Sequence, residues 1–290
     1  DSDSNFEIKR KWDGLAQHIA YVIQTNTDTT VLAIFSTVSE VSVYSVYMLI
    51  INGIRNLITA FSSGIEATFG DMIAKGEKET LKENFKSYEF LYYMIITIIC
   101  ICTIILVIPF VKVYTKGISD VNYVREKFAI IIILSEFVYS IRKPYNSLVL
   151  AAGHFRETQI GAWIESISNI IISCMLVSKY GMVGVAIGTL VSISIRTIEI
   201  IYYASKRILE RPVKEVCKKV IPLVCASVPV LFICQNLVKM NIDSFAGVII
   251  YSIVVLIIAT LIISVSNFLW NKEEAKKVFN KLKNIALGGL

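Results

Sequence analysis

The stretch that decides the fold is "HIAYVIQTNTDTTVLAIF", which runs from His18 to Phe35. Its two ends are apolar, whereas its middle, from Gln24 to Thr30, carries amides, hydroxyls and the carboxylate of Asp28. A segment of about 20 residues is long enough to cross a bilayer as a helix, but a charge at the centre of lipid costs about 2.5 to 3.5 kcal/mol. The stretch therefore predicts a membrane helix with one polar face that does not contact lipid.

The composition of the whole chain fits this class of protein. Of its 290 residues, 55% are hydrophobic, and the mean hydropathy is +0.64, which is more than a soluble domain tolerates. Eight apolar runs have roughly the length of a membrane helix. They cover residues 14–35, 42–69, 89–111, 128–151, 159–178, 182–203, 218–238 and 245–269. We therefore expect an all-α polytopic membrane protein with about eight transmembrane helices.

Lysines and arginines between these runs predict the orientation, because cytoplasmic loops are enriched in them. Nineteen lie in segments on one side of the membrane and six lie on the other. Since eight crossings return the chain to its starting side, both ends of this segment are expected in the cytoplasm. This topology also explains the net charge of +6, so no nucleic-acid partner is expected.

The same pattern divides the chain into segments. We expect a cytoplasmic linker over 1–13, a six-helix lobe over 14–203, a basic cytoplasmic linker over 204–217, two additional transmembrane helices over 218–269 and a basic cytoplasmic tail over 270–290. The tail has apolar residues at helical spacing among lysines, so it either lies on the anionic inner leaflet or forms a solvated helix.

Nine charged side chains remain inside the predicted spans, and they need a polar interior because lipid does not solvate them. Polar residues that step by three and four share one helix face, and such stripes occur in several spans. The candidates for binding an anion are Arg55, Arg142 and Lys143, and the further polar or coupling candidates are Gln24, Asp28, Asn52, Glu136, Glu165 and Asn169. Stripes on at least three helices predict a hydrated cavity between them.

Ion pairing is the alternative role for these charges. Arg196 and Glu199 are three residues apart, which suits a structural pair on one helix. Arg55 has no opposite charge within four residues on its own helix. It is therefore paired across helices, with Asp28 as a candidate partner, or hydrated, or available to an anion.

The fourth span offers a further pair and an irregularity. Glu136 and Lys143 share one helix face and can neutralise each other. The sequence Arg142-Lys143-Pro144 places a proline inside the span, which frees a carbonyl and kinks a helix. Such a segment is typical of a helix that lines a cavity.

Motifs for catalysis or metal binding are missing from the sequence. It has no glycine-rich phosphate loop and no nucleophile elbow, and its two histidines and six cysteines are not at metal-ligand spacing. We expect no enzymatic activity, no cofactor and no metal. The chain opens without Met and without a signal-peptide pattern, so we expect it to be a piece of a longer chain.

One long stretch resembles a known family. The residues "SLVLAAGHFRETQIGAWIESISNIIISCMLVSKYGMVGVAIGTLVS", Ser147–Ser192, resemble the second-lobe signature of polysaccharide flippases in the multidrug/oligosaccharidyl-lipid/polysaccharide exporter superfamily. Residues 25–50 are similar to the first two helices of that lobe. The resemblance covers about Trp12 to Trp270. It implies helices seven to fourteen of a fold with two six-helix lobes around a central cavity and two further helices, with the first lobe absent.

The resemblance implies flipping of an undecaprenyl-pyrophosphate-linked oligosaccharide across a bacterial cytoplasmic membrane, for capsule, O-antigen or a related surface polysaccharide. The lipid-linked oligosaccharide would cross by alternating access, in which the protein switches between inward-open and outward-open states. The implied partners are the lipid-linked oligosaccharide, the lipid bilayer, the absent N-terminal lobe and glycan polymerase or assembly proteins. Cavity arginines of such flippases bind pyrophosphate, which makes Arg55 the first candidate.

Two other functions stay open. A cation-coupled multidrug exporter of the same fold should have a net acidic cavity, whereas the candidate residues here lean basic. A non-transporting membrane scaffold of a glycan-assembly complex is the other alternative. For a transporter, the energy source is a membrane potential or an ion gradient that acts through Asp28 or Glu136.

Overall fold

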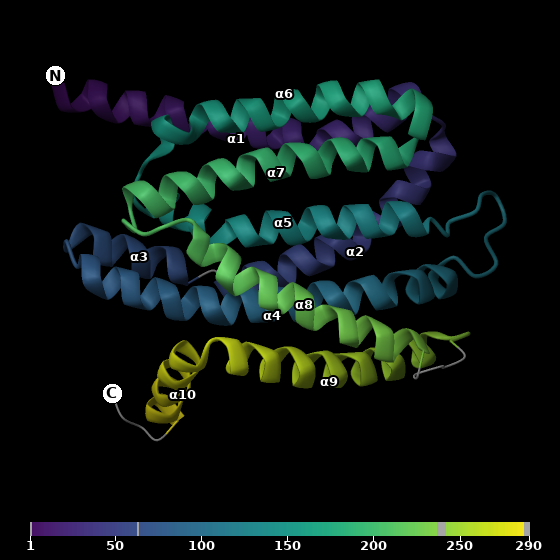
Figure 1. Cartoon of the computed structure of the whole chain (residues 1–290). Helices are drawn as coiled ribbons and strands as arrows, with labels where there is room; N and C mark the ends of the chain where they lie inside the picture. The colour runs from purple at the N-terminus through teal and green to yellow at the C-terminus, as the bar shows by residue number, and fades with distance from the viewer. Residues whose placement is uncertain (1, 63, 237–241, 287–290) are drawn as a thin grey trace. The chain divides into compact units, whose positions relative to one another are not determined.

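The computed structural model describes residues 2–62, 64–236 and 242–286, and no strand occurs within these ranges (Figure 1). The helices found there are α1 (Ser2–Phe35), α2 (Val38–Ser62), α3 (Ile65–Ala74), α4 (Lys78–Tyr114), α5 (Glu126–Ala151), α6 (Phe155–Tyr180), α7 (Met182–Arg207), α8 (Lys214–Asn236), α9 (Phe245–Trp270) and α10 (Lys272–Ala286). Among the described residues, six helices are long and apolar enough to cross a membrane, namely α2, α4, α6, α7, α8 and α9. The expected all-α, multi-pass membrane fold is confirmed.

The predicted spans agree with these helices with two differences. The runs 14–35 and 128–151 lie in α1 and α5, which are long enough to span but are not among these six candidates. The run 42–69 was expected as one helix, and this prediction is wrong at its end, because α2 ends at Ser62 and α3 begins at Ile65. Gly64 lies in this break, and glycine is a poor helix former. Glu66 therefore belongs to α3 and not to the polar stripe of α2.

Contacts divide the chain into two compact units. The first combines residues 1–70 and 115–210 and contains α1, α2, α5, α6 and α7; the second combines residues 71–114 and 211–290 and contains α4, α8, α9 and α10. The predicted lobe over 14–203 had included residues 78–114, but α4 packs within the second unit. There α4 packs against α9, with which it shares the highest hydropathy of the candidate spans, and the ring of Phe110 contacts that of Phe245.

In the first unit, glycines bring α6 and α7 into close contact (Figure 1). A Cβ atom at Gly184 would lie 2.5 Å from the carbonyl oxygen of Leu176, and one at Gly188 would overlap Ser173. The two helices are joined at Gly181, whose φ of +55° is costly for a residue with a side chain. The small residues of α7 thus form a close-packing face for α6.

In the second unit, a buried carboxylate gathers two cations. Glu89 of α4 accepts hydrogen bonds from Nη2 of Arg211, at 2.9 Å to each carboxylate oxygen, and from Nζ of Lys219, at 2.6 Å. Farther along the chain, Val278 of α10 packs against Phe90 of α4. These contacts attach α8 and α10 to α4.

Candidate functional site

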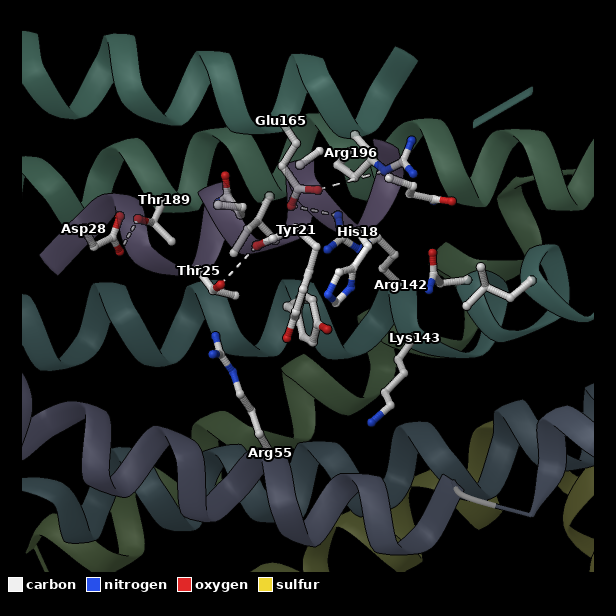
Figure 2. Close-up of a pocket in the computed structure, with 18 of the residues that line it drawn as sticks. His18, Tyr21, Thr25, Asp28, Arg55, Arg142, Lys143, Glu165, Thr189 and Arg196 are labelled. Carbon is white, nitrogen blue, oxygen red and sulfur yellow. Dashed lines mark hydrogen bonds and ion pairs between the residues drawn. The ribbon is translucent and has the colours of Figure 1, made fainter. Parts of the chain in front are cut away.

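Two adjoining cavities lie between the helices of the first unit. The smaller has a volume of about 300 Å³ and is walled by α1, α2, α5, α6 and α7 (Figure 2). The larger has a volume of about 850 Å³ and lies against α1, α2 and α5. They adjoin because they share the lining residues Tyr21, Thr25, Tyr44, Met48, Arg55, Tyr139 and Lys143.

The polar stripes predicted from the sequence line these cavities. The stripe of α1 reaches the smaller cavity with Gln17, Tyr21, Gln24 and Asp28. The stripe of α2 reaches the larger one with Ser45, Met48, Asn52, Arg55 and Thr59. Among the remaining candidates, Arg142 and Glu165 line the smaller cavity, Glu136 lines the larger one, and Lys143 lines both. Asn169 is the exception, because it is fully buried behind the wall.

Arg55 is paired across helices, with a partner other than the one expected. Its Nε lies 2.8 Å from Oε2 of Glu136 on α5, and its side chain stays 31% exposed, whereas that of Glu136 is 2% exposed. Of the alternatives left open by the sequence, pairing across helices is the one found, and the partner is Glu136 of α5 instead of the candidate Asp28. Lys143, the other possible partner of Glu136, donates to the hydroxyl of Thr59 at 2.7 Å.

A single aromatic ring lies between two of the candidate arginines. The guanidinium carbon of Arg55 is 5.6 Å from the ring centroid of Tyr139, and that of Arg142 is 4.9 Å from it. Both distances suit a cation–π contact. Tyr139 also lines both cavities, so the two cationic groups share one aromatic contact at the cavity wall.

A chain of alternating charges continues behind Arg142. Glu165 lies between Arg142, at 2.9 Å, and Arg196, at 3.9 Å, as Figure 2 shows. Arg196 also binds Glu199 three residues further on, which confirms the structural pair expected from their spacing. Gly161 leaves room for that pair, because a Cβ atom there would overlap both side chains.

Asp28 is held by neutral donors at the other end of the smaller cavity. Its carboxylate accepts hydrogen bonds from Thr189 at 2.7 Å, Asn169 at 3.1 Å and Tyr44 at 3.3 Å. A buried carboxylate needs such donors because it has lost its hydration. The site therefore ties α1 to α2, α6 and α7 through one side chain.

Sequence reasoning missed several of these partners. Thr189 belongs to a glycine-rich helix whose pattern indicated packing alone, and Tyr44 carries a hydroxyl within an apolar run. Tyr139 was recognisable as part of the polar stripe of α5, but its place between two arginines depends on how α2 and α5 face each other. The three-membered Glu89 cluster was missed as well, since Glu89 and Lys219 fall at the edges of predicted spans and Arg211 falls in a predicted linker.

The chain matches a known protein by its structure but not by its sequence. No family model matches the sequence, and no curated protein matches it. Among solved structures, the chain is similar to one described as lipid II flippase MurJ in an inward closed conformation, with a TM-score of 0.63 and 19% sequence identity. The match covers 87% of this chain and 52% of that one, so the chain spans about half the length of the structure it matches. The likeness shows that the chain has a flippase-like, polytopic helical membrane fold.

Proposed function

We propose that this chain forms one lobe of a flippase that moves an undecaprenyl-pyrophosphate-linked oligosaccharide across the bacterial cytoplasmic membrane. The product would serve capsule, O-antigen or a related surface polysaccharide. The observation that carries the proposal is the gathering of Arg55, Arg142 and Lys143 on the walls of two joined cavities inside a membrane fold. The fold-level likeness to a structure described as a lipid II flippase supports the same class of substrate.

The charge of the cavities supports an anionic substrate. Basic lining residues outnumber acidic ones, with Arg55, Arg142, Lys143 and Arg196 against Asp28, Glu136 and Glu165. A guanidinium presents paired donors that match phosphate oxygens. Among the described residues, Arg55 forms one ion pair, with Glu136, and its side chain is partly exposed, so a pyrophosphate can replace Glu136 as its partner. A cation-coupled multidrug exporter would need the opposite charge balance.

Alternating access requires a second body on the far side of the cavity. The matched structure is about twice as long as the aligned part of this chain, which supports an N-terminal lobe as a partner. In this mechanism the cavity opens to one side of the membrane and then to the other, while the pyrophosphate stays on the arginines. Asp28 and Glu136 are the carboxylates through which an ion gradient or the membrane potential would act.

The test is surface-glycan export in cells that produce the chain together with the N-terminal lobe that this proposal requires. Arg55→Ala should lower export by at least tenfold, because the main anion contact is lost, while Arg55→Lys retains part of it. Arg125→Ala is the matched control. Arg125 is also paired with a glutamate, Glu40, at 2.8 Å, but it lies outside the lining of both cavities.

The readouts separate the proposal from its rivals at matched membrane levels. Normal export in Arg55→Ala cells would overturn the substrate role of this arginine. Export that survives replacement of Arg55, Arg142 and Lys143 together would point to a scaffold. Increased sensitivity of the variants to cationic drugs, with export unchanged, would favour the multidrug exporter.

A further inference from the structure

The α1 wall of the smaller cavity differs from the walls around it. From Gly14 to Thr25 its lining residues include no acidic or basic side chain other than the imidazole of His18. Gln17, Tyr21 and Gln24 occupy successive turns of one helix face. Figure 2 shows His18 and Tyr21 projecting into the cavity, with Arg55 and Lys143 on another side of it. The cavity thus has a neutral wall and a cationic wall.

Two amide groups on the neutral wall have an unused acceptor. The carbonyl oxygens of Gln17 and Gln24 are both buried, and within the described residues neither accepts a hydrogen bond. The amide nitrogen of Gln24 has a distant partner, the hydroxyl of Ser192 at 3.4 Å. A buried carbonyl oxygen without a donor is unfavourable, so a donor from water or from a ligand in the cavity would stabilise both oxygens.

The chemistry of that occupant follows from the two walls. Donors for an amide oxygen include ammonium, guanidinium, amide N–H and hydroxyl groups. The guanidinium of Arg55 and the ammonium of Lys143 share the cavity, and like charges repel in a poorly solvated space. Uncharged donors, such as the hydroxyl groups of a sugar, are therefore favoured. The ring of Tyr21, which lines both cavities, adds an apolar surface of the kind that orients ligands in pockets.

From this arrangement we infer that Gln17, Tyr21 and Gln24 form a carbohydrate subsite that binds hydroxyl groups of the first sugar of the glycolipid. The inference rests on the proposed function, since it places the sugar next to the pyrophosphate on Arg55 and Arg142. It goes beyond that function because it assigns the two parts of the headgroup to two different walls. The cavity then selects for a glycosylated lipid over the bare pyrophosphate.

The experiment measures the Kd of two probes for the chain assembled in lipid nanodiscs with the N-terminal lobe that the proposed function requires. One probe is undecaprenyl pyrophosphate, and the other is the same lipid carrying one glucose. The unaltered chain should bind the glycosylated probe more tightly, by about fivefold to tenfold, as expected for one or two added hydrogen bonds. Gln17→Leu combined with Gln24→Leu should abolish this preference and leave the Kd of the bare lipid unchanged.

Two further variants complete the test. Asn26→Leu removes an amide from the exposed side of the same helix, where its nitrogen donates to the carbonyl oxygen of Val22 at 2.8 Å, and it should leave the preference intact. Arg55→Ala should weaken the binding of both probes by the same factor. Gln17→Glu keeps an acceptor oxygen at the site and should retain more of the preference than Gln17→Leu.

Each outcome decides between distinct conclusions. Equal binding of the two probes by the unaltered chain, or a preference that survives the double glutamine variant, would overturn the carbohydrate subsite and leave water as the occupant of this wall. A double variant that weakens both probes alike would overturn it too, since the amides would then act on folding or on the anion. Failure of both probes to bind the unaltered chain would instead overturn the proposed function.

Discussion

Both units of the molecule place ion pairs among apolar helices, but they do so in different ways. In the second unit, Glu89 is completely buried and binds two cations. In the first unit, Arg55 has one carboxylate partner and a side chain that is 31% exposed toward a cavity. A fully enclosed ion pair is hard to exchange, because breaking it leaves an unpaired buried charge. An ion pair at a cavity wall can exchange its partner for a ligand, so exposure separates a structural charge cluster from a binding site.

The largest effect is expected from breaking the enclosed cluster. Glu89→Leu leaves the charges of Arg211 and Lys219 buried without their carboxylate, which should lower the free energy of unfolding by about 3 to 5 kcal/mol. Thermal unfolding of the purified chain in detergent measures this loss. Glu79→Leu is the control, since Glu79 of the same helix pairs with Lys82 at 3.1 Å while 86% exposed and should contribute less than about 1 kcal/mol. A Glu89→Leu variant as stable as this control would remove the contrast between the two units.

A smaller effect is expected at the ring between the two cavity arginines. Tyr139→Leu removes the aromatic face that Arg55 and Arg142 share, whereas Tyr139→Phe keeps it. Loss of two cation–π contacts of about 0.5 to 1 kcal/mol each should reduce export about tenfold in the leucine variant, with export in the phenylalanine variant within twofold of normal. Membrane levels of the two variants are compared by immunoblotting. If the phenylalanine variant fails as badly as the leucine variant, the hydroxyl of Tyr139 and not its ring is the essential group.

The smallest effect is expected at Glu136, where a substitution should strengthen substrate binding instead of weakening it. It tests whether the ion pair of Arg55 can be exchanged for a ligand. Glu136→Gln removes the charge that competes with an anion for Arg55, so undecaprenyl pyrophosphate should bind the variant about threefold more tightly. Export should fall by a similar factor, because release becomes slower. Affinity measurements in nanodiscs, together with export assays, detect this combination. Weaker binding by the variant would mean that Glu136 orients Arg55 for the substrate and does not compete with it.

The sequence predicts the helices and their polar faces well, because both follow from local periodicity. The stripes of α1 and α2 occupy cavity walls as residues such as Gln24 and Asn52 suggested. The break between Ser62 and Ile65 was not predicted, since one weak helix former within a long apolar run is a poor signal of a helix end.

The partners of the charged side chains were less predictable, because they depend on which helices face each other and on how those helices are shifted along their axes. The sequence suggested Asp28 as a candidate partner for Arg55, whereas the structure pairs Arg55 with Glu136 and surrounds Asp28 with neutral donors. The Glu89 cluster combines residues more than a hundred positions apart in sequence. Charge counts placed these side chains near loops and gave no reason to join them.

The close packing of α6 on α7 makes these two helices a rigid reference for measuring the motion of other helices. A helix pair without space for a Cβ atom between Gly184 and Leu176 has little freedom to slide or rotate internally. The distance between spectroscopic labels on exposed positions of these two helices, such as Met175 and Ile198, should therefore stay constant. Changes in the distances from these two labels to labels on α2 would then report the motion of α2 itself.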